Sequence, residues 1–461
     1  MPTSGHSPNL PSSFRDPSGF LFYEHGELYR RIHTRYREHY DALMGSGLYK
    51  ALTGAGLLIG HEECGAETKK TEGTYKVVKP EPVPFISYPY EWCFSQLKDA
   101  ALTMLEIQKR AFHSGMSLKD ASAYNIQFMN GHPILIDTLS FEKYQSGQPW
   151  VAYRQFCQHF LAPLALMSLK DIRLSSLLRV HLDGIPLDLA SRLLPCRTFL
   201  RFPLLMHIHL HALSQRYFAG KKIKKTNIKL PDLSALGLVD SLESAVQSLK
   251  WRPQGTEWGR YYEDTNYSSP GYQHKKQIVS DFLDTVKPGR VWDLGANTGI
   301  FSEIAASKGM EVISFDGDPA AVEKNYLSHR PKERSRILPL VLDLTNPSPA
   351  AGWDHRERMS LAERGPSDVA LALALVHHLA ISHNIPLGMI AEYFSGICKT
   401  LLIEFVPKED SQVQRLLSAR VDVFSGYDQQ AFEREFGAFF TLKNSVTIKD
   451  SHRVLYLMLK K

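Results

Sequence analysis

The sequence lacks both a long hydrophobic run and a cluster of cysteines. No stretch of its 461 residues approaches the ~18 consecutive apolar residues that a membrane-spanning helix needs. Its five cysteines are odd in number and widely spaced, and none of them form a CxxC pair. This pattern argues against a disulfide framework and against a zinc site, so we expect a cytoplasmic protein without a bound metal.

The sequence also lacks a strong excess of charge of either sign. Its net charge is +6, of which residues 1–250 carry +7 and residues 251–461 carry −1. So small an excess does not indicate a nucleic-acid partner. Hydrophobic residues make up 43% of the chain, which excludes a wholly disordered protein because there is ample apolar surface to bury.

The composition along the chain predicts four regions. Residues 1–18 are polar and rich in Pro and Ser, without the apolar core of a secretion signal, and predict a flexible leader. Residues 19–220 predict an α+β, mostly helical domain, with helical spacing of aromatic and apolar residues already in 20–48. Residues 221–250 begin with a basic stretch that contains a proline, and predict a linker and a connecting helix. Residues 251–461 predict a second domain.

The second domain alternates strand-like and helical runs from residue 278 onward. The strands are continuously apolar and must therefore be covered on both faces, which predicts a mostly parallel, doubly wound α/β sheet. Two late strand-like runs, at 439–448 and 453–460, are separated by only a few residues. We expect them to pair antiparallel at or near an edge.

The strongest motif is the sequence VWDLGANTGIFSEIA, in which an apolar strand ends at Asp293 and a helix follows. Gly295 and Gly299 permit positive φ and a close approach of the backbone to a ligand. Asn297 takes the place of a further glycine, and asparagine tolerates left-handed backbone geometry. The helix start that follows offers free N–H groups to an anionic group.

Two further acidic residues follow the next two predicted strands. Asp316 ends the second strand, 21 residues after Gly295, where a carboxylate can accept both hydroxyls of a ribose. Asp343, preceded by Leu342, ends the third strand and could contact an adenine amine. Acids at three successive strand ends beside a glycine turn predict a nucleoside pocket.

These motifs resemble those of the class I S-adenosylmethionine-dependent methyltransferases. DLGANTG is similar to that family's first motif, and FDGDP, VLDL and LALALVHHL are similar to its next three strand ends. The resemblance covers about residues 277–461 and implies a Rossmann-like seven-stranded sheet, S-adenosyl-L-methionine as cofactor and a methyl acceptor that the sequence does not identify. It further implies that Asp293, Gly295, Asn297 and Gly299 hold the methionine moiety, Asp316 the ribose, and Leu342 and Asp343 the adenine. A dinucleotide dehydrogenase is disfavoured because the turn spells GANTG rather than GxGxxG.

His377 and His378 stand at the predicted end of the fourth strand, where the ligand crevice of such a sheet lies. Either one could take a proton from an acceptor hydroxyl or amine. The alternative is a packing role, because methyl transfer depends mostly on positioning. Glu404, at the end of the fifth strand, borders the substrate pocket or has a structural role. The aromatic segment 258–277 either covers the cofactor or packs on the sheet.

The N-terminal half holds a second constellation, Asp120, Asn125 and Asp137. It resembles the catalytic loop and metal-binding aspartate of protein-kinase-like phosphotransferases, although no His-Arg pair precedes Asp120. Alternatively these residues cap turns and close a strand, or belong to a degenerate module that binds the methyl acceptor.

The whole arrangement is similar to bacterial methyltransferases loosely called nodulation-related. The predicted function is methyl transfer from S-adenosyl-L-methionine. The alternatives are a kinase-like phosphotransferase and a cofactor-binding regulatory protein.

Overall fold

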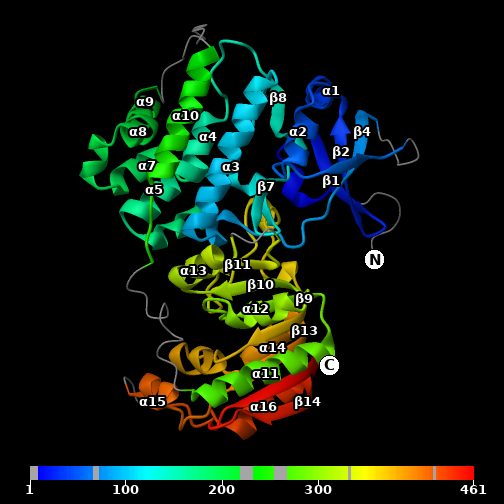
Figure 1. The fold of residues 1–461 in the computed structure, drawn as a ribbon, viewed down its shortest axis with the longest axis vertical. Helices are drawn as coiled ribbons and strands as arrows, with labels where there is room; N and C mark the ends of the chain where they lie inside the picture. The colour runs from blue at the N-terminus through cyan, green and yellow to red at the C-terminus, as the bar shows by residue number, and fades with distance from the viewer. Residues whose placement is uncertain (1–8, 66–71, 219–231, 254–266, 331–333, 419–421) are drawn as a thin grey trace. The chain divides into compact units, whose positions relative to one another are not determined.

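The computed structural model describes residues 9–65, 72–218, 232–253, 267–330, 334–418 and 422–461 (Figure 1). The chain divides into two compact units. The N-terminal unit comprises Met1–Arg252 with Gly352–Arg358, and the C-terminal unit comprises Pro253–Ala351 with Met359–Lys461. Most of the predicted linker, and the part of the aromatic segment before Tyr267, lie outside the described residues. In the described part of the chain, no helix has the length and apolar character needed to cross a bilayer.

The N-terminal unit begins with an antiparallel sheet in the order β1-β2-β4-β3. Its strands are β1 Gly19–Glu24, β2 Glu27–His33, β3 His61–Glu63 and β4 Thr74–Pro80. The prediction of helix from residue 20 was therefore wrong up to His33. His25 and Gly26 both have positive φ (51° and 83°), and this two-residue turn closes a hairpin. The spacing of the aromatic residues in this stretch fits both the helical period and the strand period, and the turn at His25 and Gly26 favours two strands.

The rest of this unit is mostly helical, as predicted. β5 Met116–Leu118 pairs antiparallel with β8 Phe141–Lys143, and β6 Ile126–Met129 forms a hairpin with β7 His132–Leu135. The helices are α1 Arg37–Gly45, α2 Leu48–Gly54, α3 Phe94–His113, α4 Tyr153–Phe156, α5 Ala162–Leu169, α6 Leu177–Val180, α7 Leu187–Leu193, α8 Phe202–Leu204, α9 His211–Phe218 and α10 Asp232–Ser248. The long helices α3 and α10 pack against each other.

The C-terminal unit contains the predicted seven-stranded sheet. Its strands are β9 Arg290–Leu294, β10 Glu311–Asp316, β11 Ile337–Val341, β12 Ser367–Ala372, β13 Cys398–Phe405, β14 Phe440–Thr447 and β15 Val454–Lys460. Their order is β11-β10-β9-β12-β13-β15-β14, and β15 runs antiparallel to both of its neighbours. The doubly wound sheet and the antiparallel final pair are confirmed.

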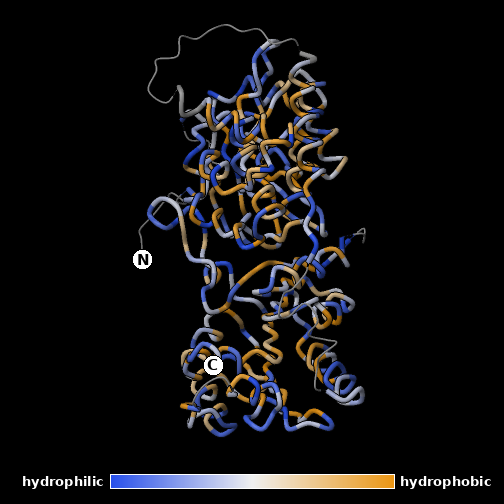
Figure 2. The backbone as a smooth tube through the Cα atoms, turned by 90° about the vertical axis from the view of Figure 1, so that its left-hand side faces the viewer, coloured by the Kyte–Doolittle hydropathy of each residue, from blue (hydrophilic) through white to orange (hydrophobic). Residues whose placement is uncertain are grey.

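Helices alternate with these strands. They are α11 Ser269–Val286, α12 Ile300–Ser307, α13 Pro319–His329, α14 Leu387–Ile397, α15 Ser411–Leu417 and α16 Gln429–Phe439. Val279 and Leu283 of α11 and Phe301 of α12 join Val291 and Leu402 of the sheet in one buried cluster. Figure 2 shows such hydrophobic stretches recurring through both units. The parallel crossovers bring the carboxyl ends of β9–β13 to one edge, where a ligand crevice is expected.

Candidate active site

The register of the parallel strands brings the predicted ligand residues together. Asp293 of β9 lies opposite Ser314 of β10 on one side and Leu371 of β12 on the other. Asp316 pairs with Val341, the residue before Leu342. The glycine turn and the ends of β10, β11 and β12 therefore share one edge of the sheet.

The turn after β9 has the left-handed geometry that its sequence predicts. Gly295, Asn297 and Gly299 have φ values of 75°, 52° and 87°. A Cβ atom at Gly299 would lie 2.6 Å from Nδ2 of Asn325, so no side chain fits there. The amide nitrogen of Asn297 donates to Oδ2 of Asp316 at 2.8 Å. The turn is thus fastened to the end of the neighbouring strand and is shaped for close backbone approach.

Asp293 is a buried carboxylate at the start of this turn. It is 2% exposed, and its Oδ2 accepts a hydrogen bond from Oγ of Ser302 at 2.6 Å. Ser302 in turn contacts Oγ of Ser314 at 2.6 Å. Burial, with a contribution from the charge of Asp316, raises the pKa of Asp293 to about 6. A cation beside this carboxylate would be stabilised, as the α-amino group of an amino-acid ligand would be.

Asp316 is held by two backbone amides. Its Oδ1 accepts from the amide of Asp318 at 2.8 Å, and its Oδ2 accepts from that of Asn297. Burial raises the pKa of Asp316 to about 6. Each carboxylate oxygen can accept a second hydrogen bond, so the fixed side chain retains acceptors for two hydroxyl groups.

Leu342 and Asp343 lie beside the end of β10. Leu342 is buried, and its amide donates to the carbonyl of Asp316 at 2.8 Å. Asp343 is exposed, and its Oδ1 accepts from the amide and the hydroxyl of Thr345 at 2.8 and 2.7 Å. A buried apolar side chain and an exposed carboxylate therefore follow each other directly after β11, and their predicted contact with adenine stays a prediction.

The two histidines do not end β12, because that strand stops at Ala372. The prediction that they end the strand was wrong, because four residues of loop separate Ala372 from His377. His377 is 1% exposed, and its Nδ1 has no hydrogen-bond partner among the described residues. Burial holds the pKa of His377 well below its usual value, and burial with the nearby charge of His383 lowers that of His378 to about 4. Both imidazoles are neutral at pH 7, and they are weak bases.

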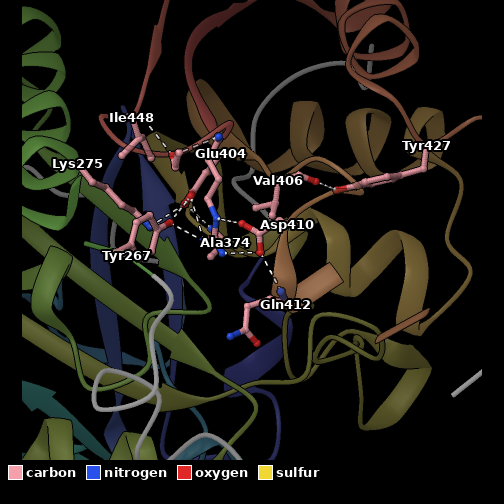
Figure 3. A network of polar contacts seen from close by, with 11 residues as sticks. Tyr267, Lys275, Ala374, Glu404, Val406, Asp410, Gln412, Tyr427 and Ile448 are labelled. Carbon is pink, nitrogen blue, oxygen red and sulfur yellow. Dashed lines mark hydrogen bonds and ion pairs between the residues drawn. The ribbon is translucent and has the colours of Figure 1, made fainter. Parts of the chain in front are cut away.

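A buried ionic network that the sequence did not predict as a unit lies beside this loop (Figure 3). Glu404 at the end of β13 is fully buried, and its Oε2 accepts from Nζ of Lys275 at 2.6 Å and from the amide of Ala374 at 2.9 Å. The hydroxyl of Tyr267 donates to the other oxygen, Oε1. Arg453 reaches the same oxygen at 3.5 Å and Tyr267 at 2.6 Å. Burial raises the pKa of Glu404, but Lys275 and Arg453 more than offset that effect, so the net shift is downward.

The network fixes the loop that carries the histidines. Ala374 has a positive φ of 50°, which is uncommon for a residue with a side chain, and Glu404 holds its amide. Leu375 follows and lies 3.3 Å from the place of a Cβ on Gly295. Arg453 also binds both oxygens of Asp410, at 2.7 and 3.0 Å. Two cations and two carboxylates therefore join α11, the loop after β12, β13, the N-terminus of α15 and the residue before β15.

In the N-terminal unit, Asp137 is already paired. Its Oδ1 lies 2.7 Å from Nη1 of Arg30, and its Oδ2 accepts from Oγ of Ser140 at 2.9 Å. Asp120 accepts from the amide of Ser122 at 2.9 Å, and burial together with the charge of Asp137 raises its pKa. Asn125 donates to Ser140 at 3.3 Å. These contacts cap turns, and the kinase-like interpretation stays a prediction.

We expect ATP with Mg²⁺ to leave the melting temperature of the protein unchanged. Asp137 is paired with Arg30 at 2.7 Å and accepts from Ser140, and Asn125 donates to the same Ser140, so these side chains are engaged within the protein. A ligand stabilises only a fold that it binds. Differential scanning fluorimetry checks this expectation. An upward shift of several degrees that disappears in Asp137→Ala would contradict it and support a phosphotransferase.

Comparisons with known proteins place the chain in a wider group. No family model matches it. It is 35% identical over 459 residues to "Nodulation protein NoeA" of Rhizobium meliloti (strain 1021), covering 97% of this chain and 95% of that protein. Among solved structures, the N-methyltransferase NodS from Bradyrhizobium japonicum WM9 is 12% identical with a TM-score of 0.32, over 42% of this chain and 98% of NodS.

Two further solved structures are similar over a comparable share of the chain. Magnesium protoporphyrin IX methyltransferase (ChlM) from Synechocystis PCC 6803 is 16% identical with a TM-score of 0.32, over 44% of this chain and 92% of ChlM. WbdD is 17% identical with a TM-score of 0.31, over 43% of this chain and 42% of WbdD. The match to the nodulation protein runs through both units and nearly the full length of both proteins, and on that ground the chain belongs to the family of NoeA.

Proposed function

We propose that the C-terminal unit transfers a methyl group from S-adenosyl-L-methionine to a separate acceptor molecule. The observation that carries this proposal is the joint placement of Asp293, the turn from Gly295 to Gly299, and Asp316 at the carboxyl edge of the sheet. The strand order with an inserted antiparallel β15 agrees with it.

The residues at this edge fit the cofactor. A side chain at Gly299 would collide with Asn325, so glycine lets the turn pack closely against α13 in its left-handed conformation. Asp316 would accept the ribose hydroxyls, Asp293 would lie near the α-amino group, and Leu342 with Asp343 would border the adenine. When bound, the cofactor would supply an electrophilic methyl group. The contribution of the chain is to bind, orient and exclude water.

The acceptor would approach from the side of the histidine loop. A cavity of about 700 Å³ is lined by Ala380 and Pro386, which follow the histidines along the chain, and by Phe424 and Tyr427, whereas its described lining includes neither histidine and no residue proposed to bind the cofactor. His378 would take a proton from a hydroxyl or amine acceptor, although its low pKa makes it an inefficient base. We further propose that residues 19–220 select the acceptor.

The direct test uses the full chain. Isothermal titration calorimetry with S-adenosylhomocysteine should give a measurable affinity, and label from tritiated methyl cofactor should enter a component of a bacterial extract. No heat at high ligand concentration would overturn the cofactor assignment. Binding without any transfer of label would support the regulatory alternative instead.

Cofactor affinity should fall as the pH drops below about 6. The pKa values of Asp293 and Asp316 are raised to about 6, so both carboxyl groups are ionised at pH 7.5 and become protonated as the pH falls below about 6. A protonated carboxyl loses acceptor capacity and charge, and the affinity should fall by up to about tenfold per pH unit for each group. Calorimetry with S-adenosylhomocysteine between pH 8 and pH 5 checks this. A flat profile would contradict it.

A further inference from the structure

An exposed apolar face lies on the N-terminal unit, in the segment that contains α8 and α9 (Figure 1). Leu200 is 90% exposed and Phe202 is 67% exposed, although such side chains usually lie in the interior. The apolar face consists of Phe199, Leu200, Phe202, Met206, Leu210 and Leu213. So many large exposed side chains in 15 successive residues indicate an interaction surface.

Helical spacing accounts for the apolar face. Phe202, Met206, Leu210 and Leu213 recur at four, four and three residues along the continuous helical segment Phe202–Phe218, in which Leu205–Leu210 is a π-helix. All four side chains are exposed, whereas His207, Ile208 and His209 between them are buried. The opposite side of this segment is buried, and the side chains of His207 and His209 there have hydrogen-bond partners. His207 bonds the hydroxyls of Tyr153 and Ser241 at 2.8 and 2.9 Å.

A second histidine fixes the same rotation of the helix. His209 bonds Oγ of Ser191 at 2.7 Å and Oγ1 of Thr198 at 2.9 Å. The helix cannot turn its apolar side inward without breaking these buried hydrogen bonds, each of which costs free energy to lose. The exposure of the apolar face is therefore a fixed property of the folded unit.

The charged residues within the segment 189–218 have one sign. Arg192, Arg197 and Arg201 are exposed beside it. The sequence contains no Asp or Glu between Asp188 and Asp232. An apolar helical side in a segment that carries only cations is typical of helices that lie in the interface of an anionic bilayer. Asp240 of α10, a helix that contacts α8, is paired with Lys109 at 2.6 Å.

We propose that the apolar face and its three arginines bind the surface of a membrane that contains anionic lipids. Leu200 and Phe202 would enter the boundary between headgroups and acyl chains, and Arg197 and Arg201 would pair with lipid phosphates. A second copy of this chain fits the surface poorly, because it would bring two basic borders together.

Co-sedimentation of the full chain with vesicles tests the proposal. Vesicles of phosphatidylcholine with phosphatidylglycerol should sediment the protein, and vesicles of phosphatidylcholine alone should not. Binding should weaken as salt is added. The double variants Leu200→Ser with Phe202→Ser, and Arg197→Gln with Arg201→Gln, should each lose about tenfold or more in vesicle affinity.

Val180→Ser is the matched control, because Val180 is also on the N-terminal unit and is 74% exposed. It should bind the anionic vesicles as the unchanged protein does. All substituted side chains are exposed, so melting temperatures should stay the same, and circular dichroism verifies this. Failure of the unchanged protein to sediment, equal binding by the double variants, or a dimer that Leu200→Ser with Phe202→Ser dissociates would each overturn the proposal.

Discussion

Asp316→Ala should weaken the binding of S-adenosylhomocysteine by about 10- to 100-fold. The substitution leaves two ribose hydroxyls without their acceptor, and hydrogen bonds of this kind contribute about 1–3 kcal/mol. It also releases the amides of Asn297 and Asp318, so the glycine turn loses a fastening. Calorimetry on the full chain measures the effect.

The same sheet provides a matched control at its opposite edge. Oδ2 of Asp368 accepts from the amides of Gly289 and Arg290 at 3.1 and 3.0 Å, just as Asp316 accepts from two amides. Asp368→Ala should therefore cost some stability and leave the affinity unchanged. Equal losses of affinity in both variants would show that Asp316 acts on the fold alone and would refute its role as a ligand.

Glu404→Gln should lower the free energy of unfolding by about 3–5 kcal/mol, the usual cost of removing one partner from a buried ion pair. Lys275 is 3% exposed, and its pKa is lowered by burial, so a lysine deprived of Glu404 is costly to keep charged. Urea unfolding followed by circular dichroism measures the difference.

Two further variants separate charge from packing. Lys275→Met combined with Glu404→Gln removes both charges and should be more stable than Glu404→Gln alone. Glu311→Gln breaks an exposed pair, Glu311–Arg336 at 2.5 Å, and should cost no more than about 1 kcal/mol. If Glu404→Gln proved as mild as Glu311→Gln, the buried network would contribute little to stability.

The position of the proposed cofactor-binding residues at the carboxyl edge of the C-terminal sheet was predictable because its geometry is local. Parallel strands end together, so Asp293, Asp316 and Asp343 needed only a correct alternation of strands and helices. The glycines of the turn after β9 gave a second indication, because positions with positive φ favour glycine. The position of the histidines was predicted less well, because the apolar residues continue past Ala372 and do not indicate where the strand ends and the loop begins.

The ionic network was beyond prediction for a different reason. Lys275 and Glu404 are 129 residues apart, and Arg453 lies another 49 residues along. Pairing at such separations depends on strand order, and in particular on β15 lying between β13 and β14. A single sequence does not indicate that one lysine of α11 is buried or which carboxylate it pairs with. The β1–β2 hairpin was missed because its aromatic residues fit two periods at once.

The position of β15 also bears on how the protein is made. Among the described strands of this sheet, β15 comes last along the chain, yet it occupies an interior place, and it is the one described neighbour of β14. While a ribosome still holds residues 454–460, β13 presents an open edge and β14 has no neighbour. Arg453, which completes the charge balance around Glu404, emerges just before them. The C-terminal unit therefore cannot complete its sheet before residues 454–460 have emerged, and until then the edge of β13 is open to pairing with other chains.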